Sequence, residues 1–194
     1  MRRAVFLDRD GVINEMVPSS DGPDSPRSAS EFRLLPGAAR AIHGLNTLGL
    51  PVVVVSNQPG IAKGKLDHSD LVAITDLMRM KLSEEFAVLN GLYYCLHHPE
   101  AIRPEYRTSC ECRKPKAGLL TKAEREMNLL LEGSYMVGDQ SKDMAAGKSV
   151  GCITFFVAST SAGQPPPAAD YMCESLAGAA RLIAELENAS VAVH

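Results

Sequence analysis

Short apolar runs alternate with amphipathic segments along this chain, and this alternation constrains its fold more than any other feature. The runs predict strands at residues 4–7, 51–55, 92–95, 135–137 and 152–157, and a short stretch at residues 171–173 closes the domain together with the last helix. The segments between them predict helices at residues 38–48, 69–89, 117–131, 142–149 and 176–186. Strands that alternate with helices form a mostly parallel sheet with right-handed crossovers. We therefore expect an α/β fold, a single Rossmann-like domain over residues 1–194 with helices flanking the sheet.

The segment 69–89 carries the clearest helical stripe. Its apolar side chains recur at helical spacing, which predicts that they all face the core: Leu71, Ile74, Leu77, Met78, Leu82 and Phe86. Two other segments are rich in proline and serine and predict loops, at residues 18–30 and 159–168. Because a long loop in a compact domain is usually functional, we interpret residues 16–32 as a substrate-side flap.

The charge balance of the chain bears on its partners. Its 194 residues carry a formal net charge of −3, which gives no electrostatic reason to expect binding to nucleic acid or to an anionic membrane. No run reaches the roughly 20 apolar residues of a membrane span, and no signal-type segment precedes the first strand. We therefore expect a cytoplasmic monomer whose partner is a small molecule.

Polar side chains follow the predicted strands at the points where the strands end. They form four clusters: Asp8 with Asp10, Ser56 with Asn57, Arg113 with Lys114, and Asp139 with Asp143. In an open α/β sheet, ligands bind in the crevice at the carboxyl ends of the strands. Several carboxylates at one edge repel each other unless a hard cation such as Mg²⁺ binds them, and a hydroxyl, an amide and a lysine are phosphate ligands. The clusters therefore predict a phosphate site that uses magnesium.

The spacing of Asp8 and Asp10 suits two different chemical roles. One carboxylate can attack phosphorus, while a second carboxyl group nearby protonates the leaving oxygen and later activates water. The simpler alternative is a pair of exposed turn carboxylates. Asp143 also has two readings, a group that supports magnesium or a carboxylate that stabilises a helix N-terminus.

Three of the five cysteines lie close to two histidines. Cys95, His97, Cys110 and Cys112 offer three thiolates and an imidazole, a closed tetrahedral set for structural Zn²⁺. His98 competes with His97 as the ligand, and buried or free thiols are the simpler alternative. Zinc would order a loop over residues 95–112 that has little apolar content, and it would orient Arg113 and Lys114 just after the last ligand.

Taken together, these motifs resemble those of the haloacid dehalogenase-like phosphatases. Asp8-Arg9-Asp10-Gly11-Val12 resembles motif I, Ser56 motif II, Lys114 motif III, and Gly138 to Asp143 motif IV. The resemblance implies that Asp8 is the nucleophile that forms an aspartyl-phosphate and that Asp10 is the general acid and base. It also implies Mg²⁺ on Asp8, Asp139 and the Asp10 carbonyl, with Ser56 and Lys114 on the transferring phosphoryl group. The implied fold has no large cap domain.

Within that family, the chain is most similar to the branch that hydrolyses heptose bisphosphate and histidinol phosphate. The shared stretches are Phe6 to Gly11, Ser56-Asn57-Gln58 and Cys112-Arg113-Lys114-Pro115. The long stretch between His97 and Cys110 resembles the heptose enzymes. This resemblance implies a magnesium-dependent phosphomonoesterase that acts on a small sugar bisphosphate such as heptose 1,7-bisphosphate, with Asn57 and Arg113 in contact with the substrate.

Three features depart from the heptose branch. Val12 stands where motif I usually has threonine, the flap lacks the usual His-Gly-Tyr-Val type of segment, and Gln140 replaces a lysine. We expect Gln140 to lie at the substrate in place of that lysine. The alternatives are an enzyme for histidinol phosphate or another sugar phosphate, and a catalytically silent binding module stabilised by zinc.

Overall fold

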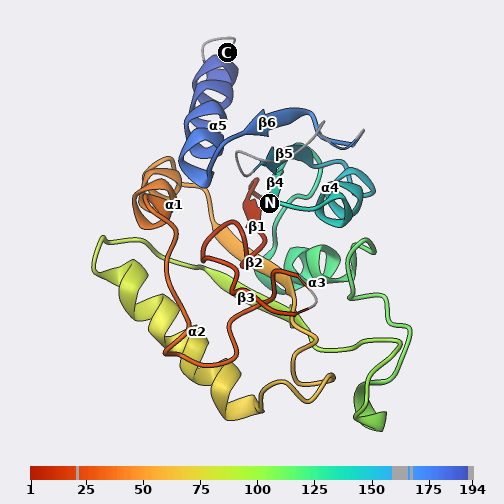
Figure 1. Ribbon diagram of the computed structural model, residues 1–194. Coiled ribbons are helices and arrows are strands. Elements are labelled where there is room, and N and C mark those ends of the chain that lie inside the picture. Colours follow the sequence, from red (N-terminus) through yellow and green to blue (C-terminus); the bar gives the residue numbers. More distant parts are fainter. Residues whose placement is uncertain (21, 159–165, 167, 192–194) are drawn as a thin grey trace.

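The computed structural model describes residues 1–20, 22–158, 166 and 168–191. Six strands form one parallel sheet in the order β3-β2-β1-β4-β5-β6. The strands are β1 (Val5–Leu7), β2 (Val52–Asn57), β3 (Gly91–Cys95), β4 (Tyr135–Gly138), β5 (Ile153–Val157) and β6 (Tyr171–Cys173). β1 pairs with β2 on one side and β4 on the other, so that Phe6 lies opposite both Val53 and Met136 (Figure 1). The predicted α/β Rossmann-like fold is confirmed.

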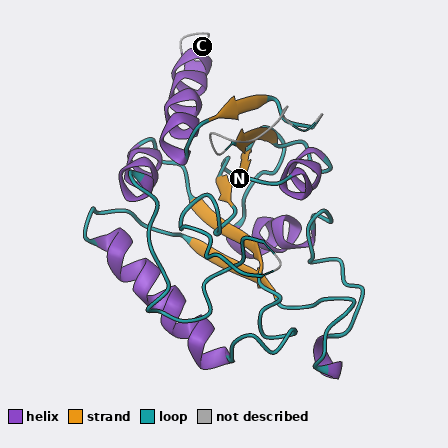
Figure 2. Ribbon diagram, in the orientation of Figure 1, coloured by secondary structure: helices purple, strands orange, loops and turns teal. Residues whose placement is uncertain are grey.

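Helices cover both faces of this sheet (Figure 2). The core on one face includes side chains of α1 (Ala38–Thr47), α2 (His68–Ser83) and α5 (Leu176–Val191). The core on the other includes α3 (Gly118–Met127) and α4 (Ser141–Lys148), and a short 3₁₀ helix, η1 (Pro104–Tyr106), lies in the loop before α3. Val5 and Leu7 pack into the first core and Phe6 into the second, because successive strand residues point to opposite faces. Both faces are buried, which explains why β1 and the valines that begin β2 are apolar without interruption.

Helix α2 is shorter than its apolar periodicity predicts. A capping box between Asp67 and Asp70 begins it, but it ends at Ser83 rather than at residue 89. Phe86 adopts a left-handed backbone with φ +57° and is 79% exposed, so its predicted place on the buried stripe is wrong. The Ala87 amide bonds back to the Leu82 carbonyl, which returns the chain to the core one residue later. The apolar spacing continues past Ser83 although the helical hydrogen bonds do not.

Two other helix ends also differ from expectation. α3 ends at Met127 because Asn128 takes the left-handed conformation that favours a helix stop, and Leu129 and Leu131 pack into the core outside the helix. α5 continues beyond residue 186 to Val191. Most of the loop predicted at residues 159–168 lies outside the described residues. No described helix is both long and apolar enough to cross a membrane.

The flap at residues 16–32, without residue 21, contains no helix or strand in the described structure. Its two arms are joined where Val17 and Asp24 exchange a pair of backbone hydrogen bonds of 2.8 and 2.9 Å. The flap leaves the sheet just after β1, so it lies at the edge where the carboxyl ends of β1, β2 and β4 meet.

Candidate active site

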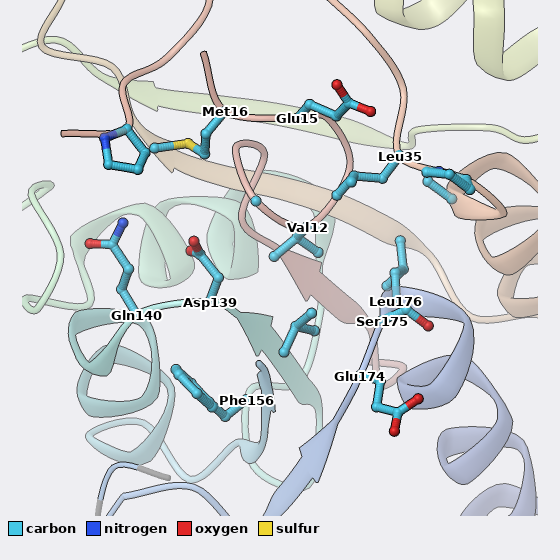
Figure 3. Close-up of a pocket in the computed structure, with 15 residues that line it drawn as sticks. Val12, Glu15, Met16, Leu35, Asp139, Gln140, Phe156, Glu174, Ser175 and Leu176 are labelled. Atoms are coloured by element: carbon cyan, nitrogen blue, oxygen red, sulfur yellow. The ribbon is translucent and has the colours of Figure 1, made fainter. Parts of the chain in front are cut away.

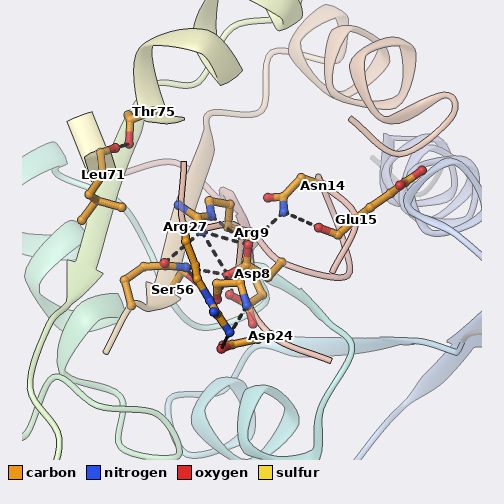
Figure 4. A network of polar contacts seen from close by, with 12 residues as sticks. Asp8, Arg9, Asn14, Glu15, Asp24, Arg27, Ser56, Leu71 and Thr75 are labelled. Carbon is orange, nitrogen blue, oxygen red and sulfur yellow. Dashed lines mark hydrogen bonds and ion pairs between the residues drawn. The ribbon is translucent and has the colours of Figure 1, made fainter. Parts of the chain in front are cut away.

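A small polar cavity lies at the carboxyl edge of the sheet, as the polar strand ends predicted. Its volume is about 200 Å³, and its lining includes Asp8, Asp10, Ser56, Asn57, Arg113 and Gln140, six of the predicted site residues. Figure 4 shows Asp8 and Ser56 close together, with Asp24 and Arg27 of the flap approaching them. The site therefore gathers groups from β1, β2, the flap, the loop before α3 and the start of α4.

Lys114 is buried just behind this cavity, between two carboxylates. Its Nζ lies 3.1 Å from Asp8 Oδ1 and 2.7 Å from Asp143 Oδ1, and none of its side chain is exposed. Burial acts to lower the pKa of Lys114, but Asp8 and Asp143 outweigh burial and raise it above its usual value. The lysine is therefore a cation held against the predicted nucleophile.

The backbone of Lys114 is held in place from β2. The carboxamide of Asn57 donates to the Lys114 carbonyl and accepts from the Lys114 amide, both at 3.0 Å. Asn57 is predicted to contact substrate and does line the cavity, but both ends of its amide are engaged by this backbone. In this structure, the two hydrogen bonds of Asn57 position the backbone of Lys114.

Three carboxylates meet beside Lys114. Oxygens of Asp8, Asp139 and Asp143 all lie within 4.8 Å of one another. Burial first, and then the charges of Asp8 and Asp143, raise the pKa of Asp139 to about 7. Asp139 Oδ1 is buried and accepts no hydrogen bond from the described residues. A buried carboxylate oxygen without a hydrogen bond, among crowded carboxylates, is available to bind a hard cation. The residues present therefore fit Mg²⁺.

Asp143 is confirmed at the helix N-terminus, and its second oxygen pairs with the buried lysine, while a role in supporting magnesium stays a prediction. Its Oδ2 accepts the Gln140 amide at 3.0 Å at the N-terminus of α4, while its Oδ1 is paired with Lys114. Gln140 itself is the N-cap residue of that helix and is exposed at the cavity wall.

Asp10 is held by a network that the sequence did not reveal. Its Oδ1 accepts from Arg9 Nε at 3.0 Å and from Asn14 Nδ2 at 2.9 Å. Its Oδ2 accepts from Gln58 Nε2 at 2.6 Å, from Ser25 Oγ at 2.7 Å and from Arg9 at 3.2 Å. Burial opposes the charge, but Arg9 and then the hydrogen bonds hold the pKa of Asp10 below its ordinary value.

The members of this network differ in how visible they are in the sequence. Arg9 and Gln58 stand inside the two quoted motifs, next to residues with predicted roles, and that adjacency is the signal that could have found them. Ser25 lies in the flap among other serines, and nothing in the local sequence distinguishes it.

A larger cavity of about 860 Å³ has Asp139 in its lining (Figure 3). It is lined mainly by apolar groups such as Val12, Leu35 and Phe156, and it shares Gln140 with the smaller cavity. The catalytic candidates Asp8, Asp10 and Ser56 line only the smaller cavity, which we therefore take as the site of chemistry.

The predicted zinc ligands also meet. The Sγ atoms of Cys95, Cys110 and Cys112 lie 3.1 to 3.6 Å from one another, and His97 Nδ1 lies 3.4 Å from Cys112 Sγ. All three thiols are free, so they do not form a disulfide. His98 Nδ1 instead accepts the Glu100 amide, which leaves His97 as the ligand.

The chemistry of this cluster fits Zn²⁺. Burial, and then Cys112, raise the pKa of the Cys95 thiol, so a cation is needed before the thiols can ionise together. Arg113 follows the last cysteine and donates to the His97 carbonyl at 3.2 Å, and Lys114 comes next. A metal at this cluster would therefore fix the segment that carries the lysine.

The doubly wound sheet carries Asp8 just after β1, Asp139 just after β4, and the buried Lys114 between the loop and these carboxylates. This arrangement defines a hydrolase of the haloacid dehalogenase-like class. A family model described as HAD-hydrolase-like matches residues 111–179. Two curated relatives are D-glycero-β-D-manno-heptose-1,7-bisphosphate 7-phosphatases. The one from Pasteurella multocida is 35% identical and covers 97% of this chain and 100% of its own, and the one from Escherichia coli K12 is 36% identical and covers 90% of each. The chain belongs to the haloacid dehalogenase-like phosphatases, in the family of these heptose-bisphosphate phosphatases.

A solved structure agrees with this placement. The D,D-heptose 1,7-bisphosphate phosphatase of B. bronchiseptica, complexed with magnesium and phosphate, has a TM-score of 0.79 and 31% identity. The alignment covers 94% of this chain and 98% of that one. The protein is a phosphatase.

Proposed function

We propose that the protein hydrolyses a phosphate monoester of a small sugar bisphosphate, D-glycero-β-D-manno-heptose 1,7-bisphosphate, through an aspartyl-phosphate. The observation that carries the proposal is Lys114, buried between Asp8 and Asp143 at the polar cavity. The choice of substrate is supported by the relatives, which are heptose-1,7-bisphosphate 7-phosphatases. The choice of reaction is supported by the polar cavity, which Asp8, Asp10 and Ser56 line.

Asp8 is the proposed nucleophile. Its Oδ1 is engaged by the Arg9 amide at 2.8 Å and by Lys114 Nζ at 3.1 Å, which leaves Oδ2 as the attacking oxygen. Lys114 and Ser56 would then bind the phosphoryl oxygens, so that the positive charge stays beside the phosphorus during transfer. Attack on the phosphoryl group forms the Asp8–phosphorus bond and breaks the bond to the leaving sugar oxygen.

Asp10 is the proposed acid and base. It would protonate the leaving oxygen and then accept the proton of the water that hydrolyses the aspartyl-phosphate. Arg9 and the hydrogen bonds hold the pKa of Asp10 below its ordinary value, so Asp10 is ionised in the free enzyme and must take up a proton before it can act as the acid.

Magnesium would be held by Asp8, Asp139 and the Asp10 carbonyl, with Asp143 next to them. When bound, Mg²⁺ would neutralise charge that develops on the phosphoryl oxygens. Structural Zn²⁺ at Cys95, His97, Cys110 and Cys112 would order the loop that delivers Arg113, which we place, with Gln140 and Asn57, on the substrate side of the cavity.

We further propose that the enzyme acts as a monomer in the cytoplasm, without nucleic acid or membrane partners. The net charge of −3 supports the part of this proposal that concerns nucleic acid and anionic membranes, since it gives no electrostatic reason for binding to either.

The test is phosphate release from a panel of phosphorylated metabolites with Mg²⁺, with Asp8→Asn as the inactive control. The panel includes the heptose 1,7-bisphosphate, histidinol phosphate and other sugar monophosphates. The highest kcat/KM is expected for the heptose bisphosphate. A higher kcat/KM for histidinol phosphate would establish the alternative substrate, and no release from any phosphoester would leave the silent binding module.

A further inference from the structure

The flap places one hydroxyl group on the catalytic carboxyl. Ser25 Oγ donates to Asp10 Oδ2 at 2.7 Å, and Ser25 lines the same polar cavity as Asp8. Among the groups that bond the Asp10 carboxylate, those of Arg9, Asn14 and Gln58 come from almost fully buried residues, whereas Ser25 is only half-buried. Ser25 is therefore the partner of Asp10 that can leave.

The carboxylate of Asp10 has no free acceptor position while Ser25 is bound. An ionised carboxylate offers about four lone-pair sites. In Asp10 the four shortest hydrogen bonds fill them, two on each oxygen, from Arg9 Nε, Asn14, Gln58 and Ser25. A leaving oxygen or a water that exchanges a proton with Asp10 must take one of these positions. The position that faces the cavity is the one that Ser25 occupies.

An ion pair holds Ser25 in this place. Asp24, the preceding residue, is paired with Lys65 Nζ at 2.5 Å and with the Arg27 guanidinium at 3.4 Å. Lys65 lies outside the flap, in the segment between β2 and α2, so this pair ties the flap to the body of the domain. The Asp24 carboxylate also accepts the Ser25 amide at 2.9 Å, which couples the ion pair directly to the serine.

Both cations of this ion pair line the polar cavity. Lys65 and Arg27 share one carboxylate, Asp24, and a phosphate group brings more negative charge and three acceptor oxygens. An anionic group in the cavity can therefore compete with Asp24 for Lys65, and its success frees Asp24 and Ser25 together.

We propose that Ser25, Asp24 and Lys65 form a gate over Asp10 that is opened by a second phosphate group of the substrate. This inference rests on the proposed function and adds the residues that select bisphosphates over monophosphates. A monophosphate must break both the Ser25–Asp10 bond and the Asp24–Lys65 pair, and its leaving oxygen replaces only the bond to Asp10. A bisphosphate breaks the same contacts and replaces the ion pair with its own contacts to Lys65. A ligand shifts such an equilibrium only by its differential affinity for the two states, and Lys65 supplies that difference.

The experiment compares kcat/KM for the heptose 1,7-bisphosphate with that for the same sugar carrying only the 7-phosphate. In Ser25→Ala, the monophosphate no longer has to open the gate, so its kcat/KM is expected to rise about tenfold, equivalent to 1.4 kcal/mol. The bisphosphate gains less, and the ratio of the two values falls. In Lys65→Gln, the monophosphate also improves, while the bisphosphate loses its partner and the ratio approaches one.

Ser28→Ala is the matched control, since Ser28 lies in the same flap but its hydroxyl bonds only that of Ser30 at the surface. Both kcat/KM values are expected to match the wild type. If Ser25→Ala lowers both values, the serine positions Asp10 and the gate is wrong. If Lys65→Gln leaves the monophosphate unchanged and weakens only the bisphosphate, Lys65 is a simple binding residue and the gate is again wrong. Failure of the proposed function looks different, because the wild type would then hydrolyse neither compound.

Discussion

Gly11 approaches Asp139 so closely that there is no room for a side chain between them. A Cβ at Gly11 would lie 2.3 Å from Asp139 Oδ2, and the φ of +78° disfavours any residue with a side chain. We expect Gly11→Ala to displace this carboxylate and to lower kcat/KM by about 100-fold, the effect of misplacing a reacting group by roughly 1 Å. Steady-state kinetics would measure the loss in kcat/KM, and a Mg²⁺ titration would show whether the displaced carboxylate raises the Mg²⁺ concentration needed for activity.

Gly49→Ala is the matched control for this substitution. Gly49 has the same φ of +78°, but a Cβ there would meet nothing within 4 Å. Both variants should lose about 1 to 2 kcal/mol of unfolding free energy from left-handed strain. Only Gly11→Ala should lose activity, and equal kcat/KM values in the two variants would contradict the role of Asp139.

The pKa of Asp139 predicts how magnesium stabilises the fold. Folding raises the pKa of this acid from an ordinary 3.8 to about 7, so the folded protein without Mg²⁺ favours the protonated form. Between these two values the folded protein holds a proton on Asp139 that the unfolded chain has lost. The free energy of unfolding therefore falls as the pH rises from about 4 to about 7. Mg²⁺ binds the ionised form, so we expect it to raise the Tm more at pH 8 than at pH 5.

Thermal unfolding at the two pH values, with the zinc content checked, measures this effect. Without Mg²⁺, Asp139→Asn should be more stable than the wild type at pH 8, because it removes a charge that the carboxylate cluster repels. A Mg²⁺ shift that is the same at both pH values would show that the crowding of carboxylates does not govern binding.

At the scale of elements, the loop between β3 and α3 links the cluster of three cysteines and His97 to the buried Lys114. Three of its residues in succession are the proposed zinc ligand Cys112, the cavity residue Arg113 and the buried Lys114. We expect Cys110→Ser to lower the zinc content, the Tm and kcat/KM, the last by about tenfold or more, since small displacements of catalytic groups have large effects. Metal analysis and kinetics on the same preparation would measure all three.

Cys152→Ser controls for the loss of a thiol. Cys152 is also buried, but it lies outside the cluster and its Sγ donates to the Leu131 carbonyl, a bond that a serine hydroxyl can make. This variant should keep its zinc and its kcat/KM. Full zinc occupancy in Cys110→Ser would show that the four residues are not a metal site.

At the scale of the whole molecule, α5 is tied to the sheet and to the start of the chain through one carboxylate. Glu187 accepts a 2.5 Å hydrogen bond from the Tyr135 hydroxyl and pairs with Arg3 at 2.8 Å. We expect Tyr135→Phe to lower the free energy of unfolding by about 1 to 2 kcal/mol, because a hydrogen bond to a charged group is lost. Urea denaturation measures the change.

Activity separates this structural tie from the catalytic site. Tyr135 begins β4, and Asp139 follows its end, so the strand itself should keep its register without the hydroxyl. The kcat/KM of Tyr135→Phe should stay within about twofold of the wild type at a temperature where the protein is folded. A large loss of activity there would mean that α5 helps to position the catalytic edge.

The sequence by itself determined the order of the elements and the class of chemistry. Apolar runs predict strands because burial on both faces of the sheet excludes polar residues. The polar groups that follow those runs must meet at one edge, since the carboxyl ends of parallel strands lie at the same edge of the sheet. For this reason Asp8, Ser56, Lys114 and Asp139 could be found from one chain alone. The four zinc candidates were also visible, since their ligand types are rare and clustered.

Only the tertiary structure decided how these groups are held. The partners of Asp10 come from the segments that follow β1 and β2 and from the flap, and the carboxamide of Asn57 is engaged by a backbone 57 residues away. The choice of His97 over His98 and the stop of α2 at Ser83 depend on packing and on hydrogen bonds that no local pattern encodes. Sequence periodicity reports which face of a segment is buried, but contacts between distant segments depend on where the folded chain brings them together.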